Sequence, residues 1–205
     1  MEAYKNDISS AELSQIEVEI KNLMNQEDVA KLSENLPQIA NLVNSVLERI
    51  KDIYQVYPAL LIVSEFLTLA PKKVPQLFQQ RPDIISNILK YCSSPVLHVP
   101  AYNFKTRNAV FSIYQSFLLN KEQLLYQIDN PSTFISAVLA GIDEEKDPRN
   151  LIMTYDIIYF MLRQYASKMD DKKAEDLIKP FIDEIFDKIS CYFPINFVPP
   201  KNDKY

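Results

Sequence analysis

Apolar residues recur at helical spacing along nearly the whole chain. Ser9 precedes Glu12 at the spacing of a capping box, and apolar side chains then recur on one face through Leu23. The segment that starts at Pro58 is apolar nearly all round, as expected of a helix packed on both sides. Amphipathic or apolar stretches that predict helices lie at residues 13–23, 39–50, 58–67, 84–92, 110–117, 134–139, 151–162 and 181–189.

The prolines that precede these predicted helices occur at regular intervals along the chain. Proline suits the first turn of a helix, so each proline that precedes an amphipathic stretch predicts a helix start. One series of predicted starts has intervals of 45, 49 and 49 residues, and a second has intervals of 43 and 47. The first comprises Pro37, Pro82, Pro131 and Pro180, and the second comprises Pro58, a position near Ala101, and Pro148.

Two interleaved series of similar period predict a repeated helix–turn–helix unit. A period in the forties matches HEAT or armadillo repeats rather than the shorter ankyrin or tetratricopeptide units. The alternative is an irregular bundle with fortuitously regular prolines. We therefore predict an all-α, HEAT-like solenoid of antiparallel helix pairs in one domain, 1–205. Within it we expect an N-terminal capping region at 1–36, helix-pair repeats at 37–192 and an extended proline-rich segment at 193–205. Such arrays offer extended surfaces rather than enclosed pockets, which favours binding over catalysis.

Composition and charge narrow the functional classes. The single glycine, Gly141, argues against sheet-rich folds and phosphate-binding glycine loops. The net charge of −5 argues against direct binding of nucleic acid. The N-terminus has no signal-peptide pattern, and the longest apolar run, residues 59–63, is too short to span a membrane. Cys92 and Cys191 are 99 positions apart, which fits a reducing cytosol or nucleus and indicates no metal cluster.

Candidate catalytic groups are few. His98 is the only histidine, and it lacks partners at metal-ligand or catalytic spacing. Acidic clusters occur at residues 143–145, 175–176 and 183–187, and we interpret them as solvated turns and helix faces rather than as an acid–base pair. The sequence therefore predicts a protein that is not an enzyme and that needs no cofactor.

Two short segments contain residues that helix formation alone does not explain. In the first, Asp147 is a good N-cap and Pro148 a good first helical residue, whereas Arg149 opposes the helix dipole there. We expect Arg149 to pair with a carboxylate of an adjacent repeat or to contact a partner. The candidate interaction residues of this segment are Lys146, Asp147, Pro148, Arg149 and Asn150, and those of the proline-rich tail are Tyr192, Phe193, Pro194, Phe197, Pro199, Pro200, Asn202 and Asp203.

These two segments together resemble the N-terminal domain of the MMS-nineteen family, the large HEAT-repeat subunit of the cytosolic iron–sulfur protein assembly targeting complex. Residues 56–60 and 104–113 resemble further helix starts of that family, so the likeness covers roughly residues 40–205. The chain departs from the family pattern after Asp203, which predicts an N-terminal piece of a longer array.

The resemblance implies a cytoplasmic and nuclear adaptor that brings apo-protein clients to the cluster-delivery machinery. Its expected partners are the assembly targeting subunits and clients such as DNA helicases and polymerases, with a link to TFIIH and nucleotide excision repair. An adaptor of nuclear transport or trafficking with the same architecture is the alternative, and an enzyme on an unfamiliar helical fold is a third possibility.

Overall fold

The described residues of the computed structural model form helices and turns and contain no β-strand. They are residues 8–25, 29–49, 53–73, 76–92 and 102–191. No helix among them is long and apolar enough to cross a membrane. In chain order the elements are α1 (Ser10–Met24), α2 (Val29–Arg49), α3 (Ile53–Lys73), α4 (Leu77–Gln80), α5 (Pro82–Cys92), α6 (Phe104–Leu119), the 3₁₀ turn η2 (Leu125–Gln127), α7 (Pro131–Gly141), α8 (Pro148–Lys168), α9 (Asp171–Ile178), the 3₁₀ turn η3 (Lys179–Phe181) and α10 (Ile182–Ser190).

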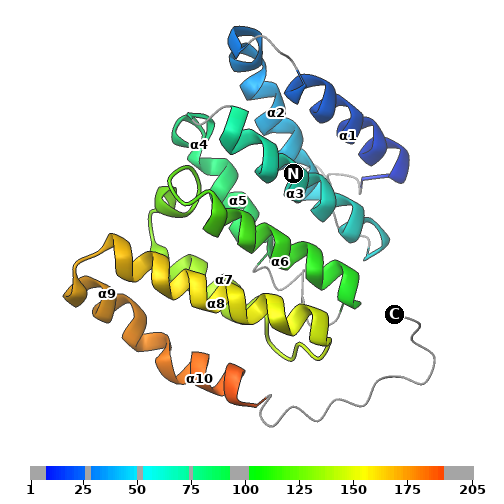
Figure 1. Ribbon diagram of the computed structural model, residues 1–205. Coiled ribbons are helices and arrows are strands. Elements are labelled where there is room, and N and C mark those ends of the chain that lie inside the picture. The colour runs from blue at the N-terminus through cyan, green and yellow to red at the C-terminus, as the bar shows by residue number, and fades with distance from the viewer. Residues whose placement is uncertain (1–7, 26–28, 50–52, 74–75, 93–101, 192–205) are drawn as a thin grey trace, which may run out of the picture.

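The helices lie in two layers (Figure 1). In the first layer α1 contacts α3, α3 contacts α6, and α6 contacts α8. In the second layer α2 contacts α5, α5 contacts α7, and α7 contacts α10. Successive helices also pack across the layers, as α1 does with α2 and α6 with α7. Each layer is therefore built from helices that contact their neighbours in that layer, and the chain progresses from one end of the stack to the other.

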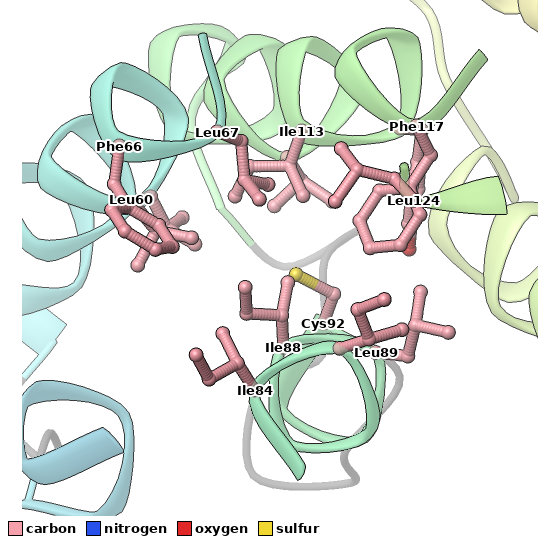
Figure 2. Close-up of a cluster of buried hydrophobic side chains, with 14 of the residues drawn as sticks. Leu60, Phe66, Leu67, Ile84, Ile88, Leu89, Cys92, Ile113, Phe117 and Leu124 are labelled. Carbon is pink, nitrogen blue, oxygen red and sulfur yellow. The ribbon is translucent and has the colours of Figure 1, made fainter. Parts of the chain in front are cut away.

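A continuous apolar core lies between the layers. Figure 2 shows side chains of α3 and α6 that point towards side chains of α5. These residues are almost completely buried, so the spacing of apolar positions along each helix identifies its inward face. The labelled members are Leu60, Phe66, Leu67, Ile84, Ile88, Leu89, Cys92, Ile113, Phe117 and Leu124.

Local capping explains where several helices begin. Ser9 and Glu12 form the expected reciprocal capping box at the start of α1. Pro82, Pro131 and Pro148 are each the first residue of a helix, as predicted.

Two predicted helix starts are wrong. Pro37 lies inside α2, which begins at Val29, and Pro58 lies inside α3, which begins at Ile53. Both prolines are exposed on the outside of their helices. A proline removes one hydrogen bond to the preceding turn, and solvent can satisfy the freed carbonyl where that side of the helix faces water.

Two other predicted starts are displaced by a few residues. Pro180 lies in η3, the 3₁₀ turn that precedes α10, rather than in the first turn of the helix. The helix expected near Ala101 begins at Phe104, with Asn103 as its N-cap; Ala101 itself lies outside the described residues.

The single glycine marks a close approach between α6 and α7. A Cβ atom at Gly141 would lie 2.8 Å from the hydroxyl oxygen of Tyr114 and 2.9 Å from its Cε2 atom. The Tyr114 ring cannot move aside easily, because it is fully buried and its hydroxyl donates a 2.8 Å hydrogen bond to the carbonyl of Ala137. Glycine is needed here for space, since its φ is not positive.

Candidate protein-binding surface at residues 145–150

The turn between α7 and α8 is organised around a buried carboxylate. Glu145 is completely buried, and its two oxygens accept a forked pair of hydrogen bonds from Arg107, from Nε at 2.8 Å and Nη2 at 2.7 Å. The backbone amides of Lys146 and Asp147 donate to Oε1 at 2.9 and 2.8 Å, and Asn150 Nδ2 donates to Oε2 at 3.0 Å. A buried carboxylate is tolerated when a cation and several donors surround it, as they do here.

The same network fastens this turn to the start of α6. Asn150 Nδ2 also donates to the carbonyl of Phe104 at 3.1 Å, and Asn108 Nδ2 donates to Asn150 Oδ1 at 3.0 Å. Arg107 Nη1 donates to the carbonyl of Tyr102, just before α6. The first turns of α6 and α8 are therefore held side by side at one edge of the first layer (Figure 1).

Asp147 and Arg149 build the exposed part of the helix start. Asp147 caps α8 by accepting a 3.0 Å hydrogen bond from the backbone amide of Arg149. Its carboxylate also accepts from Arg149 Nε at 2.9 Å and Nη2 at 2.7 Å, and these side-chain bonds lower the pKa of Asp147 below its ordinary value. The Arg149 guanidinium lies 4.0 Å from the centre of the Phe104 ring, in a cation–π arrangement.

Arg149 has contacts both within its own segment and with a neighbouring helix. The carboxylate bound by its guanidinium in this structure is Asp147, two residues earlier in the chain. Arg149 also contacts a neighbouring helix by stacking on Phe104 of α6. The positive charge of Arg149 at a helix start therefore neutralises the capping carboxylate of Asp147, and it is also exposed at the surface.

The segment divides sharply into buried and exposed residues. Glu145 and Asn150 are completely buried, and Asp147 and Pro148 are partly buried. Lys146 is exposed, and the side chain of Arg149 retains 60% of its accessible surface. Of the candidate interaction residues in this segment, Lys146 and Arg149 are therefore the ones that the fold offers to another molecule.

Exposure also extends beyond the segment itself. Ile152, in the first turns of α8, is 67% exposed, and Lys105, beside Phe104, is exposed as well. Two helix starts thus present three cations and an apolar side chain on a backbone held by the buried network below them.

One interpretation of the acidic clusters is wrong. Asp143 and Glu144 are exposed as expected, but Glu145 is the most buried carboxylate in the described part of the chain. Its partner Arg107 lies 38 residues earlier, and no local pattern connects the two positions. The only local signal is that Glu145 stands two residues before the N-cap, where its side chain can accept from the backbone amides that precede the helix.

The second candidate segment lies outside the described residues. It comprises Tyr192, Phe193, Pro194, Phe197, Pro199, Pro200, Asn202 and Asp203. His98 also lies outside them. In the described part, no group of three or more His, Cys, Asp or Glu side chains is arranged to hold a metal ion. Burial raises the pKa of the Cys92 thiol to about 12, so this sulfur remains protonated at neutral pH.

Comparison with known proteins identifies relatives over most of the chain. Residues 14–205 match the family MMS19_N, described as "Dos2-interacting transcription regulator of RNA-Pol-II". The MMS19 nucleotide excision repair protein homolog of Mus musculus is 29% identical over 193 residues, which cover 94% of this chain and 16% of the relative. The Bos taurus homolog is 31% identical over 169 residues, or 82% of this chain and 14% of the relative.

A yeast protein shows a shorter match. A DNA repair/transcription protein of Saccharomyces cerevisiae, which also bears the name MMS19, is 35% identical over 72 residues, which cover 35% of this chain and 6% of that protein. The chain thus spans 16% or less of the length of each of these three relatives. No solved structure matches it significantly.

Proposed function

This chain belongs to the MMS19 N-terminal family, and from that membership we propose that it acts as a non-catalytic scaffold in iron–sulfur protein assembly. It presents apo-protein clients, among them helicases and polymerases of DNA replication and repair, to the subunits that deliver the cluster in the cytosol. The proposal includes action in cytoplasm and nucleus and a link to TFIIH. The repair and transcription functions in the names of its relatives support it.

The arrangement of helices supports a scaffold role. The two layers, in which each helix contacts its counterparts before and after it, are the packing expected of a HEAT-like solenoid. We propose that the chain is one stretch of such an array. A solenoid exposes a long surface relative to its mass, and proteins that hold several partners use such surfaces.

The observation that carries the proposal is the exposed pair Lys146 and Arg149 on its buried support. An interface gains affinity when its contact residues are already ordered, because less conformational entropy is lost on binding. The Glu145 network orders the backbone beneath these two cations without using Lys146 in an ion pair among the described residues.

Charge changes at these two positions test the proposal. Full-length protein carrying Lys146→Glu and Arg149→Gln is used to recover assembly subunits and apo-helicases from cells. We expect recovery to fall several-fold. The melting temperature should change little, because the ion pair of Arg149 is exposed and such pairs contribute about 0–1 kcal/mol. A matched variant with Lys72→Glu and Lys172→Gln, two exposed lysines on α3 and α9, should bind normally.

Three results are informative against the proposal. Undiminished recovery of clients by the Lys146 and Arg149 variant would remove this surface from the binding site. Failure of the unaltered protein to recover any assembly subunit or apo-client would overturn the scaffold role in cluster delivery. Recovery of Ran or of transport cargo in their place would support a transport adaptor instead.

A further inference from the structure

A groove between α6 and α8 lies about two helical turns away from the Lys146 and Arg149 surface. It has a volume of about 320 Å³. Leu118 and Ile157, which are nearly or completely buried, form its floor. Leu119 at the end of α6 is 82% exposed and Phe160 on α8 is 41% exposed, so the sides of the groove are apolar and open to solvent.

The register of the two helices defines the direction of the groove. Asn108 of α6 hydrogen bonds to Asn150 of α8, and both helices continue from that point in the same direction (Figure 1). Asp156 therefore lies towards one end of the groove, and Lys121 lies towards the other. On α8 the lining residues 156 to 164 span about 12 Å, at 1.5 Å per residue, which is a little over two helical turns.

The two ends of the groove carry opposite charges that the described residues do not neutralise. Neither Asp156 nor Lys121 forms an ion pair within the described part of the chain. Lys21 on α1 is different, because it is paired with both Glu17 and Glu65. The groove is thus an apolar trough with an anion at one end and a cation at the other.

These features favour a helical occupant over an extended one. An extended peptide needs partners for its backbone amides and carbonyls, whereas a helix satisfies its own. The groove offers few such partners: its two amide side chains are Gln115 and Gln164, and Gln164 Oε1 already accepts from the hydroxyl of Tyr126 at 3.3 Å. Two apolar side chains on one face of a helix, four residues apart, are separated by about 6 Å along its axis and fit within the trough.

The charges also specify the direction of that helix. An amphipathic helix is most stable with acidic residues in its first turn and basic residues in its last. Such a helix meets both charges of the groove when its first turn lies near Lys121 and its last turn near Asp156. It then runs antiparallel to α6 and α8.

We propose that this groove binds a short amphipathic helix of a partner protein, with an acidic first turn at Lys121, a basic last turn at Asp156 and two apolar anchors against Leu119 and Phe160. The inference rests on the proposed function, because it identifies a docking site for a protein held by the scaffold.

The test uses two synthetic helical peptides of about 14 residues, each conformationally constrained because free helices of that length are marginal in water. Both carry leucines four residues apart. One has glutamates in its first turn and lysines in its last, and the other has glutamine at all of these positions. Fluorescence anisotropy measures their binding to the full chain. We expect the first peptide to bind at least about fivefold more tightly, the sum of two exposed charge pairs.

Substitutions in the groove connect this preference to named residues. The variant Lys121→Glu gives the groove two anionic ends and should abolish the preference for the charged peptide. Phe160→Ala should weaken the favoured peptide about tenfold, because aromatic anchors dominate such contacts. Leu119→Ser, at a position 82% exposed at the end of its helix, should weaken it without loss of helicity by circular dichroism. Val18→Ser, at an exposed apolar position of α1 outside the groove, is the matched control.

Three results would overturn the inference. If neither peptide binds at millimolar concentration, the groove is not a helix-binding site. If both peptides bind equally, the charges of the groove do not select its occupant. Self-association of the chain that Leu119→Ser abolishes would assign the groove to a second copy. Recovery of clients through Lys146 and Arg149 is measured separately, so failure of the peptides leaves that test intact. If the peptide binds but clients are not recovered, the helix-binding groove is supported and the role in cluster delivery is contradicted.

Discussion

Two polar networks, each with an asparagine pair and an arginine–carboxylate pair, occur in different layers of the molecule. In the second layer Asn87 Nδ2 donates to Asn44 Oδ1 at 3.1 Å, which joins α5 to α2. In the first layer Asn108 Nδ2 donates to Asn150 Oδ1 at 3.0 Å, which joins α6 to α8. The paired asparagines are 43 and 42 residues apart. Each layer therefore contains one asparagine pair across neighbouring helices, at nearly the same separation in sequence.

Each network also contains an arginine forked onto a carboxylate. The Arg81–Asp83 bonds are both 2.8 Å long, and the Arg107–Glu145 bonds are 2.8 and 2.7 Å long. The geometry is the same, but the surroundings are not. The side chain of Asp83 is 44% exposed and lies two residues from its arginine, whereas Glu145 is completely buried and lies 38 residues from its own.

Geometry alone therefore does not determine how much an ion pair contributes to the free energy of unfolding. Water can solvate Asp83 if its arginine is removed, so the pair contributes little. Water cannot reach Glu145, so loss of one partner leaves a charge in a medium of low dielectric. We therefore expect the network around Glu145 to be essential for stability and the one around Asp83 to be dispensable.

The largest expected effect comes from removing one arginine at a time. Arg107→Ala should lower the free energy of unfolding by about 3–5 kcal/mol, because Glu145 loses its cation while buried. Arg81→Ala should cost about 1 kcal/mol or less, since its carboxylate is exposed. Urea unfolding followed by circular dichroism measures both. Equal losses in the two variants would contradict the comparison.

An intermediate effect is expected from the two asparagine pairs. Asn150→Ala should cost about 1–3 kcal/mol, because buried Glu145 and the carbonyl of Phe104 each lose a donor. Asn44→Ala removes bonds to Asp83 and Asn87, which are only partly buried, and should cost about 0.5–1 kcal/mol. The same unfolding measurement ranks the two, and a larger loss for Asn44→Ala would reverse the assignment.

The smallest effect is a dependence of stability on pH through Asp83. The hydrogen bonds from Arg81 lower the pKa of Asp83 in the folded protein. Its contribution to stability is therefore complete above the unfolded pKa of about 3.9, and it is lost as the pH falls through the lower folded pKa. Asp83→Asn should slightly reduce the dependence of the melting temperature on pH below about pH 4. It should leave stability at pH 7 within about 1 kcal/mol.

A matched measurement separates this effect from general acid unfolding. Asp129→Asn changes an exposed aspartate between η2 and α7, and its pH profile should follow that of the unaltered protein. A profile of Asp83→Asn that is indistinguishable from that of Asp129→Asn would show that the Arg81 pair contributes nothing measurable.

The features that the sequence predicts correctly depend on local signals. The capping box at Ser9, the N-cap at Asp147 and the helix starts at Pro82, Pro131 and Pro148 all depend on residues within one turn of one another. Pro37 and Pro58 do not begin helices as predicted, since a proline also occurs inside a helix when its outer side meets solvent.

The arrangement of the candidate site could be predicted only in part. Arg149 exceeds what capping requires, and it is exposed together with its neighbour Lys146, whereas Asn150 of the same motif is buried in the network. The sequence predicts that Glu145 faces solvent, because it follows two acidic residues in a turn. The carboxylate is buried instead, because folding brings Arg107 of α6 against it.

The amino-acid sequence by itself determined that the described chain is helical, where many of its helices begin and which of their faces are apolar. These properties depend on interactions within a few residues: proline and capping side chains at helix starts, and apolar spacing near 3.6. Only the tertiary structure decided that Glu145 is buried and Asp83 is not. Burial depends on the layers that pack around a residue, and in a stack of helix pairs those layers come from parts of the chain about 40 residues away.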